Sequence, residues 1–178
     1  MSVDFFWRRV AERSLAELSP KGLVALVPHW FDSEFGPLRE AGAVLGVERN
    51  GYLMHVALTG APGGAGTDPA AAQFPVFGGE ERVESGGDPG SDGFREWKVL
   101  VLRPDEVRTA SAFLDGVDID DLLAASDAAL AAEVVSLGSA TPWSEKWSSA
   151  LAADLRELKG FFAGAAAVGD AVIKFEST

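Results

Sequence analysis

His55 has the clearest chemical potential in this sequence, because histidine changes charge near neutral pH. It lies in the run Glu48–Gly60, which is apolar on nearly every side as a helix, so we expect a buried imidazole. A buried imidazole needs a hydrogen-bond partner and could act as an acid, a base or a ligand. The alternative, which we favour, is a core histidine packed on Tyr52 and Thr59.

A small set of residues near His55 could form a ligand pocket. Arg49 and Tyr52 precede it in the same run, and the turn Gly78-Gly79-Glu80 follows a short apolar segment. We therefore predict Arg49, Tyr52, His55, Gly78, Gly79 and Glu80 as ligand-binding residues. The ligand would be a small molecule.

None of the common catalytic or cofactor motifs is complete in this sequence. The two histidines, His29 and His55, are far apart and cysteine is absent, which argues against a metal site. The glycines of residues 60–66 lack the lysine and hydroxyl residue of a phosphate loop, and the acidic run 115–121 lacks the order of a calcium loop. We expect no catalytic residue, no metal and no cofactor, and the balance favours a protein that is not an enzyme.

Trp143 is the predicted interface residue. The last long helix has an apolar stripe at steps of three and four, formed by Trp147, Leu151, Leu155, Leu158, Phe162 and Ala165. Trp143 lies off this stripe. Because partly buried tryptophans are enriched at binding surfaces, Trp143 is a candidate contact for a protein partner.

Composition limits the class of partner. The chain has 178 residues, 47% of them hydrophobic, and a net charge of -12, which predicts one folded domain over residues 1–178. An acidic chain repels phosphate backbones, so no nucleic acid is expected, whereas a basic partner fits. No apolar run approaches the roughly 20 residues of a membrane helix, and the N-terminal charges follow the apolar residues, unlike a signal peptide. We expect a cytoplasmic protein with no membrane partner.

The closing segment is expected to organise the chain. Thr141-Pro142 offers a hydroxyl cap and a first-turn proline, so it predicts the start of a helix that ends at Gly169. Gly164 within that helix predicts that a neighbouring element crosses closely. Residues 170–176 then alternate, with Val172 and Lys174 on one side, which predicts a half-buried strand.

The other segments predict a mixture of strands and helices. Strands are expected at 3–10, 74–79 and 96–102. Helices are expected from Ser14 to an interruption at Pro20, at 23–31, in one turn within 32–39, at 104–115, and at 118–135 with a break near Ser126. Residues 50–59 predict a helix or, as the competing interpretation, a strand, and 61–73 and 80–94 predict glycine-rich loops. About four strands and five or six irregularly placed helices predict a single α+β domain.

The order of several segments resembles the YfbM-like family of bacterial domains of unknown function. The matching segments are Phe5–Val10, Glu48–Gly60, Phe74–Gly79, Leu102–Val107, Asp154–Phe162 and Ala165–Phe175. The resemblance implies a compact α+β domain and favours the helix for residues 50–59. It carries no established activity. Gly51 stands where the family usually has tryptophan, and Thr141-Pro142 where the family tends to have Tyr-Pro.

Three functional hypotheses remain open. The leading one is a non-enzymatic binding or interaction domain, because no catalytic constellation accompanies the negative charge. The second is a small-molecule binder or an unrecognised enzyme with a pocket near His55. The third is an immunity-like or antitoxin-like protein that binds a basic partner, since some members of the resembling family accompany toxin systems.

Overall fold

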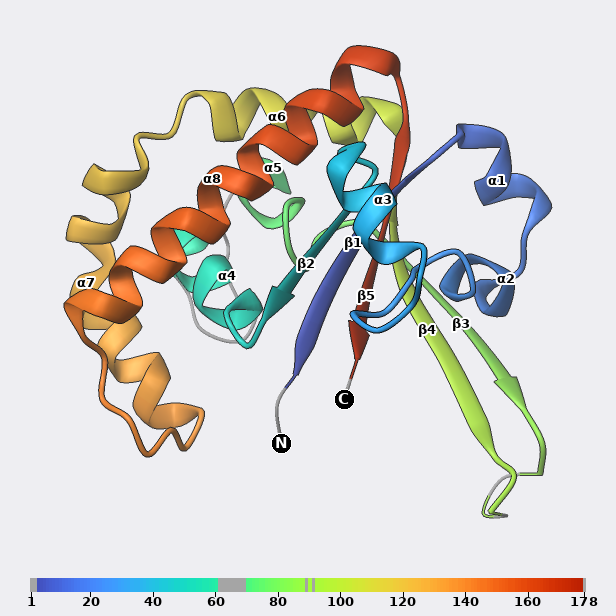
Figure 1. Ribbon diagram of the computed structural model, residues 1–178, viewed down its shortest axis with the longest axis horizontal. Coiled ribbons are helices and arrows are strands. Elements are labelled where there is room, and N and C mark those ends of the chain that lie inside the picture. Colours follow the sequence, from blue (N-terminus) through green and yellow to red (C-terminus); the bar gives the residue numbers. More distant parts are fainter. Residues whose placement is uncertain (1–2, 61–69, 89, 91, 178) are drawn as a thin grey trace.

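Five strands form one antiparallel sheet in the order β2-β1-β5-β4-β3 (Figure 1). This computed structural model describes residues 3–60, 70–88, 90 and 92–177. The strands are β1 (Asp4–Val10), β2 (Val44–Glu48), β3 (Glu80–Gly86), β4 (Arg95–Leu102) and β5 (Ala171–Ser177). The first and last strands are neighbours inside the sheet, which confirms that 3–10 is a strand with partners on both sides.

Helices cover both faces of the sheet. The described residues form eight, three of which accompany one face: α1 (Glu12–Glu17), α2 (Pro20–Val24) and α3 (Phe35–Glu40). The other side carries α4 (Gly51–Thr59), α5 (Ala70–Gln73), α6 (Pro104–Asp115), α7 (Ile119–Ser136) and α8 (Glu145–Val168). Figure 1 shows α8 running the length of this larger helical layer. The α+β class is therefore confirmed.

Alternating strand residues supply two hydrophobic cores. On β1, Phe5 and Trp7 pack with α4, α6, α7 and α8, whereas Phe6 packs with the α1–α3 side. On β5, Val172 belongs to the first core and Ile173 to the second. β5 is thus buried on both faces over most of its length, more than the half-buried strand that its alternation predicts.

The apolar stripe of α8 is confirmed. Its five residues from Leu151 to Ala165 are buried, and Trp147 at the start is half-buried. Gly169 ends the helix in the left-handed conformation with φ 74°, as expected from its lack of a side chain. The predicted start at Thr141 is wrong, because Ser144 caps the helix by accepting a hydrogen bond from the Trp147 N–H. Thr141 instead forms a local turn with Ser139.

The predicted break in the helix 118–135 is also wrong. α7 is continuous, and Asp118 caps it by accepting from the backbone N–H groups of Asp120 and Asp121. The side chains of Ser126 and Asp127 both have partners outside the helix. The Ser126 hydroxyl reaches the Ala57 carbonyl, and Asp127 accepts from the Trp143 indole.

The N-terminal helices differ from their predicted boundaries. α1 begins at Glu12, so Ser14 lies inside the helix and does not cap it. Pro20, predicted to interrupt a helix, instead begins α2 after Ser19, whose side chain accepts from the Gly22 N–H. α2 ends at Val24, so residues 23–31 are mostly turns. The helical turn within 32–39 is confirmed as part of α3.

Two strands and one turn were not anticipated. β2 was missed, and β3 occupies the first half of the segment 80–94 that was predicted as a loop. The predicted strand 74–79 is a turn, in which the N–H groups of Val76 and Gly78 both donate to the Gln73 carbonyl. Residues 61–69 of the predicted loop 61–73 lie outside the described residues. The remaining residues of that segment form α5.

The helix interpretation of residues 50–59 is confirmed. Every residue of α4 except the half-buried Tyr52 is buried, and the helix ends at Gly60 with φ 71°. Gly51 allows α4 to approach β1, since a Cβ there would lie 2.2 Å from Cδ2 of Phe5. This contact explains why no large side chain occupies position 51.

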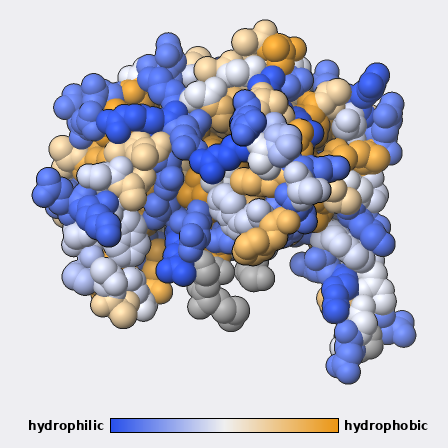
Figure 2. All heavy atoms as spheres, viewed as in Figure 1, coloured by the Kyte–Doolittle hydropathy of each residue, from blue (hydrophilic) through white to orange (hydrophobic). Residues whose placement is uncertain are grey.

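β3 and β4 continue beyond the rest of the sheet as a projecting ladder (Figure 1). Figure 2 shows that the projection is largely hydrophilic, in keeping with a solvent-exposed ladder. In the part of the chain that the structure describes, no helix combines the length and the apolarity needed to cross a membrane.

Candidate functional site

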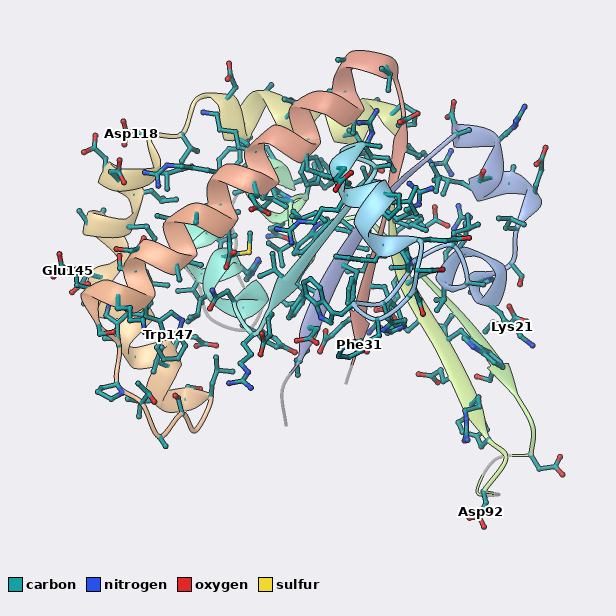
Figure 3. The ribbon with its side chains drawn as sticks, in the orientation of Figure 1. Lys21, Phe31, Asp92, Asp118, Glu145 and Trp147 are labelled. Carbon is teal, nitrogen blue, oxygen red and sulfur yellow. The ribbon has the colours of Figure 1, made fainter. Side chains whose placement is uncertain are left out.

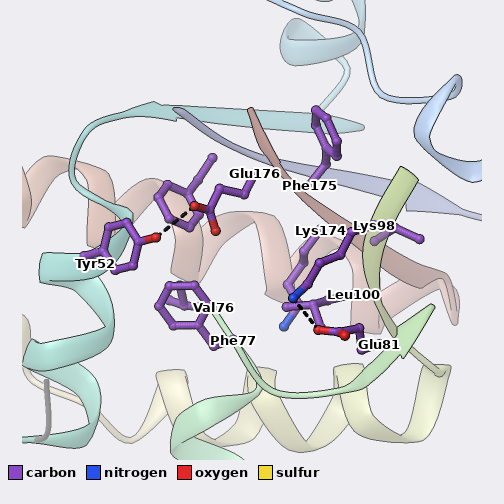
Figure 4. Close-up of a pocket in the computed structure, with 11 residues that line it drawn as sticks. Tyr52, Val76, Phe77, Glu81, Lys98, Leu100, Lys174, Phe175 and Glu176 are labelled. Atoms are coloured by element: carbon purple, nitrogen blue, oxygen red, sulfur yellow. Dashed lines mark hydrogen bonds and ion pairs between the residues drawn. The ribbon is translucent and has the colours of Figure 1, made fainter. Parts of the chain in front are cut away.

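A cavity of about 530 Å³ lies where β4 and β5 separate, on the same face of the sheet as α4 (Figure 4). The two strands pair only over residues 100–102 of β4 and 172–174 of β5. Beyond the last pair, Leu100 with Lys174, the space between them opens. The cavity is lined by Phe5, Tyr52, Val76, Phe77, Glu81, Lys98, Val99, Leu100, Lys174, Phe175 and Glu176.

The turn 74–79 closes one side of this cavity and is held by side chains from the sheet. The Trp7 indole N–H donates to the Pro75 carbonyl at 2.7 Å. The Lys174 amine donates to the Phe74 carbonyl at 2.6 Å and also to the Gly78 carbonyl. The turn therefore uses its carbonyl groups as acceptors for buried side-chain donors of the sheet.

Lys174 is the most unusual titratable group of the cavity. Its side chain is 4% exposed, and burial lowers the pKa of its amine well below the ordinary value, with the Glu106 carboxylate opposing this shift. A charged amine is costly to bury, so the low pKa favours the neutral form. The two carbonyl acceptors orient the amine at the cavity wall.

Tyr52 and Glu176 form a polar pair on the opposite side of the cavity. The Tyr52 hydroxyl donates to Glu176 Oε1 at 2.8 Å, and burial together with this bond raises the pKa of Tyr52 to about 12. The cavity wall around this pair is aromatic. The centroid of the Tyr52 ring lies 5.3 Å from the ring centroids of both Phe5 and Phe77. Tyr52 is thus fixed as a neutral phenol among apolar rings.

Lys98 and Glu81 form an ion pair on the sheet side of the cavity, with 2.6 Å between Nζ and Oε2. The hydrogen bond with Glu81 raises the pKa of Lys98. Both side chains are about half exposed, so water screens the pair. Figure 4 shows the amine ends of Lys98 and Lys174 directed toward the part of the cavity beside Glu81. One cavity thus contains one solvated ammonium and one buried amine.

Of the residues predicted to bind a ligand, Tyr52 lines the cavity. His55 is 1% exposed and lies behind the wall, with its ring edge-on to Phe77 at 4.9 Å between centroids. Its backbone carbonyl accepts from the Thr59 hydroxyl. The predicted contact of His55 with the core is therefore present, although its main aromatic neighbour is Phe77.

The other predicted residues surround the cavity without lining it. Arg49 is exposed, has a left-handed backbone with φ 65°, and pairs with Glu48. Gly78 contributes the carbonyl that Lys174 binds, and Gly79 has φ 111°. Glu80 bonds Arg82, which lowers the pKa of the Glu80 carboxyl. The six residues thus do not converge on one point.

The sequence could have indicated Lys174. It lies two residues after Val172, on the same side of the strand and between the apolar residues Ile173 and Phe175, where the alternation predicts a core position. The other charged residues of the cavity, Lys98, Glu81 and Glu176, give no such signal. They meet only because β3, β4 and β5 are neighbours in the sheet.

A second hollow of about 500 Å³ lies between α7 and α8, beside the predicted interface residue Trp143. Its lining includes the carboxylates of Asp120, Asp127 and Glu145, with Arg156 as the basic residue. Trp143 is half-buried: its ring packs on Trp147 with 6.0 Å between centroids, and its indole N–H donates to Asp127 at 2.8 Å. Figure 3 shows Glu145 directed away from α8 at this end.

No group of three or more histidine, aspartate or glutamate side chains is arranged to hold a metal ion in the described part of the chain. The chemistry available at the cavity is therefore that of amines, carboxylates, a phenol and aromatic surface.

Neither the family models nor the curated protein sequences give a match to this chain. Among solved structures, the chain is similar to YfbM from Escherichia coli, which is described as a protein of unknown function. The match has a TM-score of 0.58 and 11% sequence identity, and it covers 97% of this chain and 98% of the other. Identity this low establishes the fold alone, and by its fold this chain is YfbM-like.

Proposed function

We propose that this protein is a non-enzymatic binding domain and that its site is the cavity between β4, β5 and the turn 74–79. The support is the cavity itself, whose volume of about 530 Å³ falls within the range of small-molecule sites. Apolar and aromatic walls with a few fixed polar groups are typical of such sites. The sequence predicts a pocket near His55, and the ring of Phe77 separates His55 from this cavity.

The wall chemistry limits the ligand. The rings of Phe5, Tyr52 and Phe77 suit a flat or aliphatic body, and the pairs Tyr52–Glu176 and Lys98–Glu81 suit polar groups at its ends. A small organic molecule with an apolar centre and hydrogen-bonding ends fits these features. A nucleotide fits poorly, because the Lys98 ammonium is already paired with Glu81 and burial favours the neutral form of the Lys174 amine.

A thermal-shift screen against metabolites tests this proposal. A ligand at a hundredfold excess over its Kd stabilises the native state by about 2.7 kcal/mol, which is readily measured. Leu100→Trp would fill the cavity from β4, and the matched control Leu137→Trp places the same side chain at an exposed site after α7. We expect stabilisation of the wild type and of Leu137→Trp but not of Leu100→Trp. Equal stabilisation of all three would overturn the assignment of the site, and no stabilisation by any compound would overturn the proposal.

His55→Ala decides whether the histidine takes part. The variant removes the ring that supports Phe77, so a folded variant that no longer binds would give His55 a role in the site. A variant that unfolds would make His55 a core residue. Circular dichroism measured beside the thermal-shift screen separates the two results.

A second candidate function is binding of a basic protein through the hollow between α7 and α8. The observation that favours it is a lining with three carboxylates and one basic residue, in which Asp127 binds Trp143 and Asp120 pairs with Arg156, in a chain of net charge -12. Such a surface complements Lys- and Arg-rich partners, and electrostatic attraction accelerates their association. This is the arrangement that an immunity-like protein would need.

Charge reversal tests the second candidate. Glu145→Lys with Asp127→Lys would abolish capture of a basic partner from lysate of the source organism. The control makes the same change of charge elsewhere, by Asp92→Lys at the far end of the molecule (Figure 3) with Glu96→Lys near the start of β4. Capture that falls equally in both would show attraction by net charge alone. Capture of no basic partner by the wild type would count against this function.

A further inference from the structure

We propose that Lys174 is a nucleophilic amine that binds a small aldehyde or ketone in the cavity as a Schiff base. The inference rests on the proposed function of the cavity as a small-molecule site, and it names the class of ligand. Lysine amines that are buried are the ones proteins use for this chemistry.

The hydrogen bonds of Lys174 match a neutral amine. A neutral amine has two N–H donors, and the described residues supply two acceptors, the carbonyl oxygens of Phe74 and Gly78. The fourth tetrahedral direction at nitrogen is then a lone pair, whereas in an ammonium it would be a third N–H that needs an acceptor. The two carbonyls thus hold the amine in the form that can attack a carbonyl carbon.

Burial also favours the neutral form of the Lys174 amine. The Lys174 side chain is 4% exposed, and burial lowers the pKa of its amine well below the ordinary value. Lys98 in the same cavity has a raised pKa because of its bond to Glu81, so its amine stays protonated. Of these two amines, Lys174 is the nucleophile and Lys98 is a proton donor.

The reaction balances without a further reagent. The Lys174 nitrogen forms a bond to the carbonyl carbon and loses one of its two protons, while the carbonyl oxygen takes up one proton to give a carbinolamine. The C–O bond then breaks, and the oxygen leaves as water with a second proton. Amine, carbonyl compound and one proton thus give an iminium ion and water. Lys98 and Glu81, on the sheet side of the cavity, can exchange these protons with solvent.

The adduct changes the contact with the turn 74–79. An iminium nitrogen keeps one N–H, so either Phe74 or Gly78 loses its donor. Addition of water to the iminium carbon reverses the adduct, and the lost hydrogen bond couples ligand binding to the turn. The body of the ligand would pack on the rings of Phe5, Tyr52 and Phe77.

Reductive trapping tests the proposal on the intact chain. The protein is treated with benzaldehyde and sodium cyanoborohydride at neutral pH, and the benzylated residue is located by peptide mass mapping. The chain has five lysines, at positions 21, 98, 146, 159 and 174, and the α-amino group is a competing amine with a pKa near 8. We expect Lys174 to be labelled at least about tenfold faster than Lys98, since each unit of pKa above the pH reduces the neutral fraction tenfold.

Two variants give the proposal a second test. Leu100→Trp keeps Lys174 but fills the cavity, so its labelling at position 174 should fall, whereas Leu137→Trp should be labelled like the wild type. Labelling spread evenly over the lysines would overturn the assignment of Lys174. So would labelling at position 174 that Leu100→Trp leaves unchanged.

Thermal shifts measured with benzaldehyde alone separate this inference from the function on which it rests. Stabilisation that Leu100→Trp abolishes, without labelling of Lys174, would refute the Schiff base and leave the cavity as a binding site. If benzaldehyde neither stabilises nor labels the chain, the Schiff base is refuted. The metabolite screen then decides whether the cavity is a binding site.

Discussion

The Lys174 amine lies 2.6 Å from the carbonyl oxygen of Phe74, a residue 100 positions earlier in the chain. Strand β5 therefore holds the turn 74–79 against the sheet through a buried side chain. The same contact forms part of the wall of the cavity, so the stability of the turn and the chemistry of the site depend on one residue.

Lys174→Met should destabilise the protein strongly. The variant keeps the length of the side chain but leaves the carbonyl groups of Phe74 and Gly78 without their donor. An unsatisfied buried polar group costs about 1–3 kcal/mol, so we expect a loss of about 2 kcal/mol or more in the free energy of unfolding. Urea unfolding followed by tryptophan fluorescence measures it.

Lys159→Met is the matched control for this prediction. Lys159 also donates to two backbone carbonyls, those of Asp115 and Val117, but a third of its side chain is exposed. Water can replace these donors, so the loss should stay below about 1 kcal/mol. Similar losses in the two lysine variants would show that the burial of Lys174 does not determine the loss in the free energy of unfolding.

The stability of the wild type should rise with pH from the folded-state pKa of Lys174 up to about pH 10. The folded-state pKa of Lys174 is lowered, so over this range the unfolded chain binds more protons than the native state, and stability increases with pH. Tyr52 and Lys98 have raised pKa values and act in the opposite direction only above about pH 10. Urea unfolding at several pH values should show this slope in the wild type and a smaller slope in Lys174→Met. A slope that survives the substitution would assign it to other groups.

Tyr52 should ionise far above its ordinary pKa of 10. The chain has one tyrosine, so an ultraviolet titration reports this residue alone. Burial and the bond to Glu176 raise the pKa of Tyr52 to about 12. Glu176→Gln removes the negative charge and should lower the midpoint, although burial should keep it above 10. A midpoint at 10 in the folded wild type would show that neither burial nor the bond to Glu176 acts on Tyr52, and equal midpoints in the wild type and Glu176→Gln would show that the pair does not form.

Asp154→Asn should not destabilise the protein at neutral pH. Asp154 accepts from the Asn50 side-chain amide at 2.6 Å, and an asparagine oxygen can accept the same bond. Burial raises the pKa of Asp154, with the Asn50 hydrogen bond opposing the shift, so the native state retains the proton to a higher pH than the unfolded chain. The wild type should therefore lose stability relative to Asp154→Asn as the pH rises from about 3.8 through the folded-state pKa.

Asp154→Val provides the contrast. It removes the acceptor and leaves the Asn50 amide with one partner fewer, at a cost of about 1 kcal/mol. Thermal unfolding at acid and neutral pH measures both variants. If Asp154→Asn and Asp154→Val lose the same stability, the hydrogen bond contributes nothing.

Gly160→Ala should stabilise the protein, and Gly164→Ala should do so less. Both glycines lie inside α8, where alanine is favoured over glycine by about 1 kcal/mol. A Cβ at Gly160 meets no atom within 4 Å, whereas one at Gly164 would lie 3.2 Å from Nη1 of Arg9. The end of Arg9, which pairs with Asp170, must then move. The urea midpoints of Gly160→Ala and Gly164→Ala compare their stabilities. An equal gain in stability would mean that the Arg9 side chain moves at no cost in free energy.

The sequence determined the elements whose signals are local. The stripe of α8, its end at Gly169 and the strand β5 follow from spacing and from glycine conformation, and all three are present, although β5 is buried on both faces over most of its length. The same holds for α4 and for its end at Gly60. Residues in these segments carry the information needed to form them, because helix and strand periodicities depend on near neighbours.

Competing local signals were decided by tertiary contacts. Thr141 and Ser144 are both suitable helix caps, and the bond between Trp143 and Asp127 accompanies the start at Ser144. The turn 74–79 is as apolar as a strand, but the donors of Trp7 and Lys174 come from distant strands and satisfy its carbonyls. No local pattern can show which carbonyl a distant donor will reach.

The cavity is wholly a product of the tertiary structure. Tyr52 was predicted from its neighbourhood in sequence, but Lys98, Lys174 and Glu176 come together because β4 and β5 are paired over three residues and then separate. The sequence specifies that β4 and β5 are strands. The register between these strands, which are far apart in the chain, decides at which residue they stop pairing. It also decides which charged side chains face the cavity.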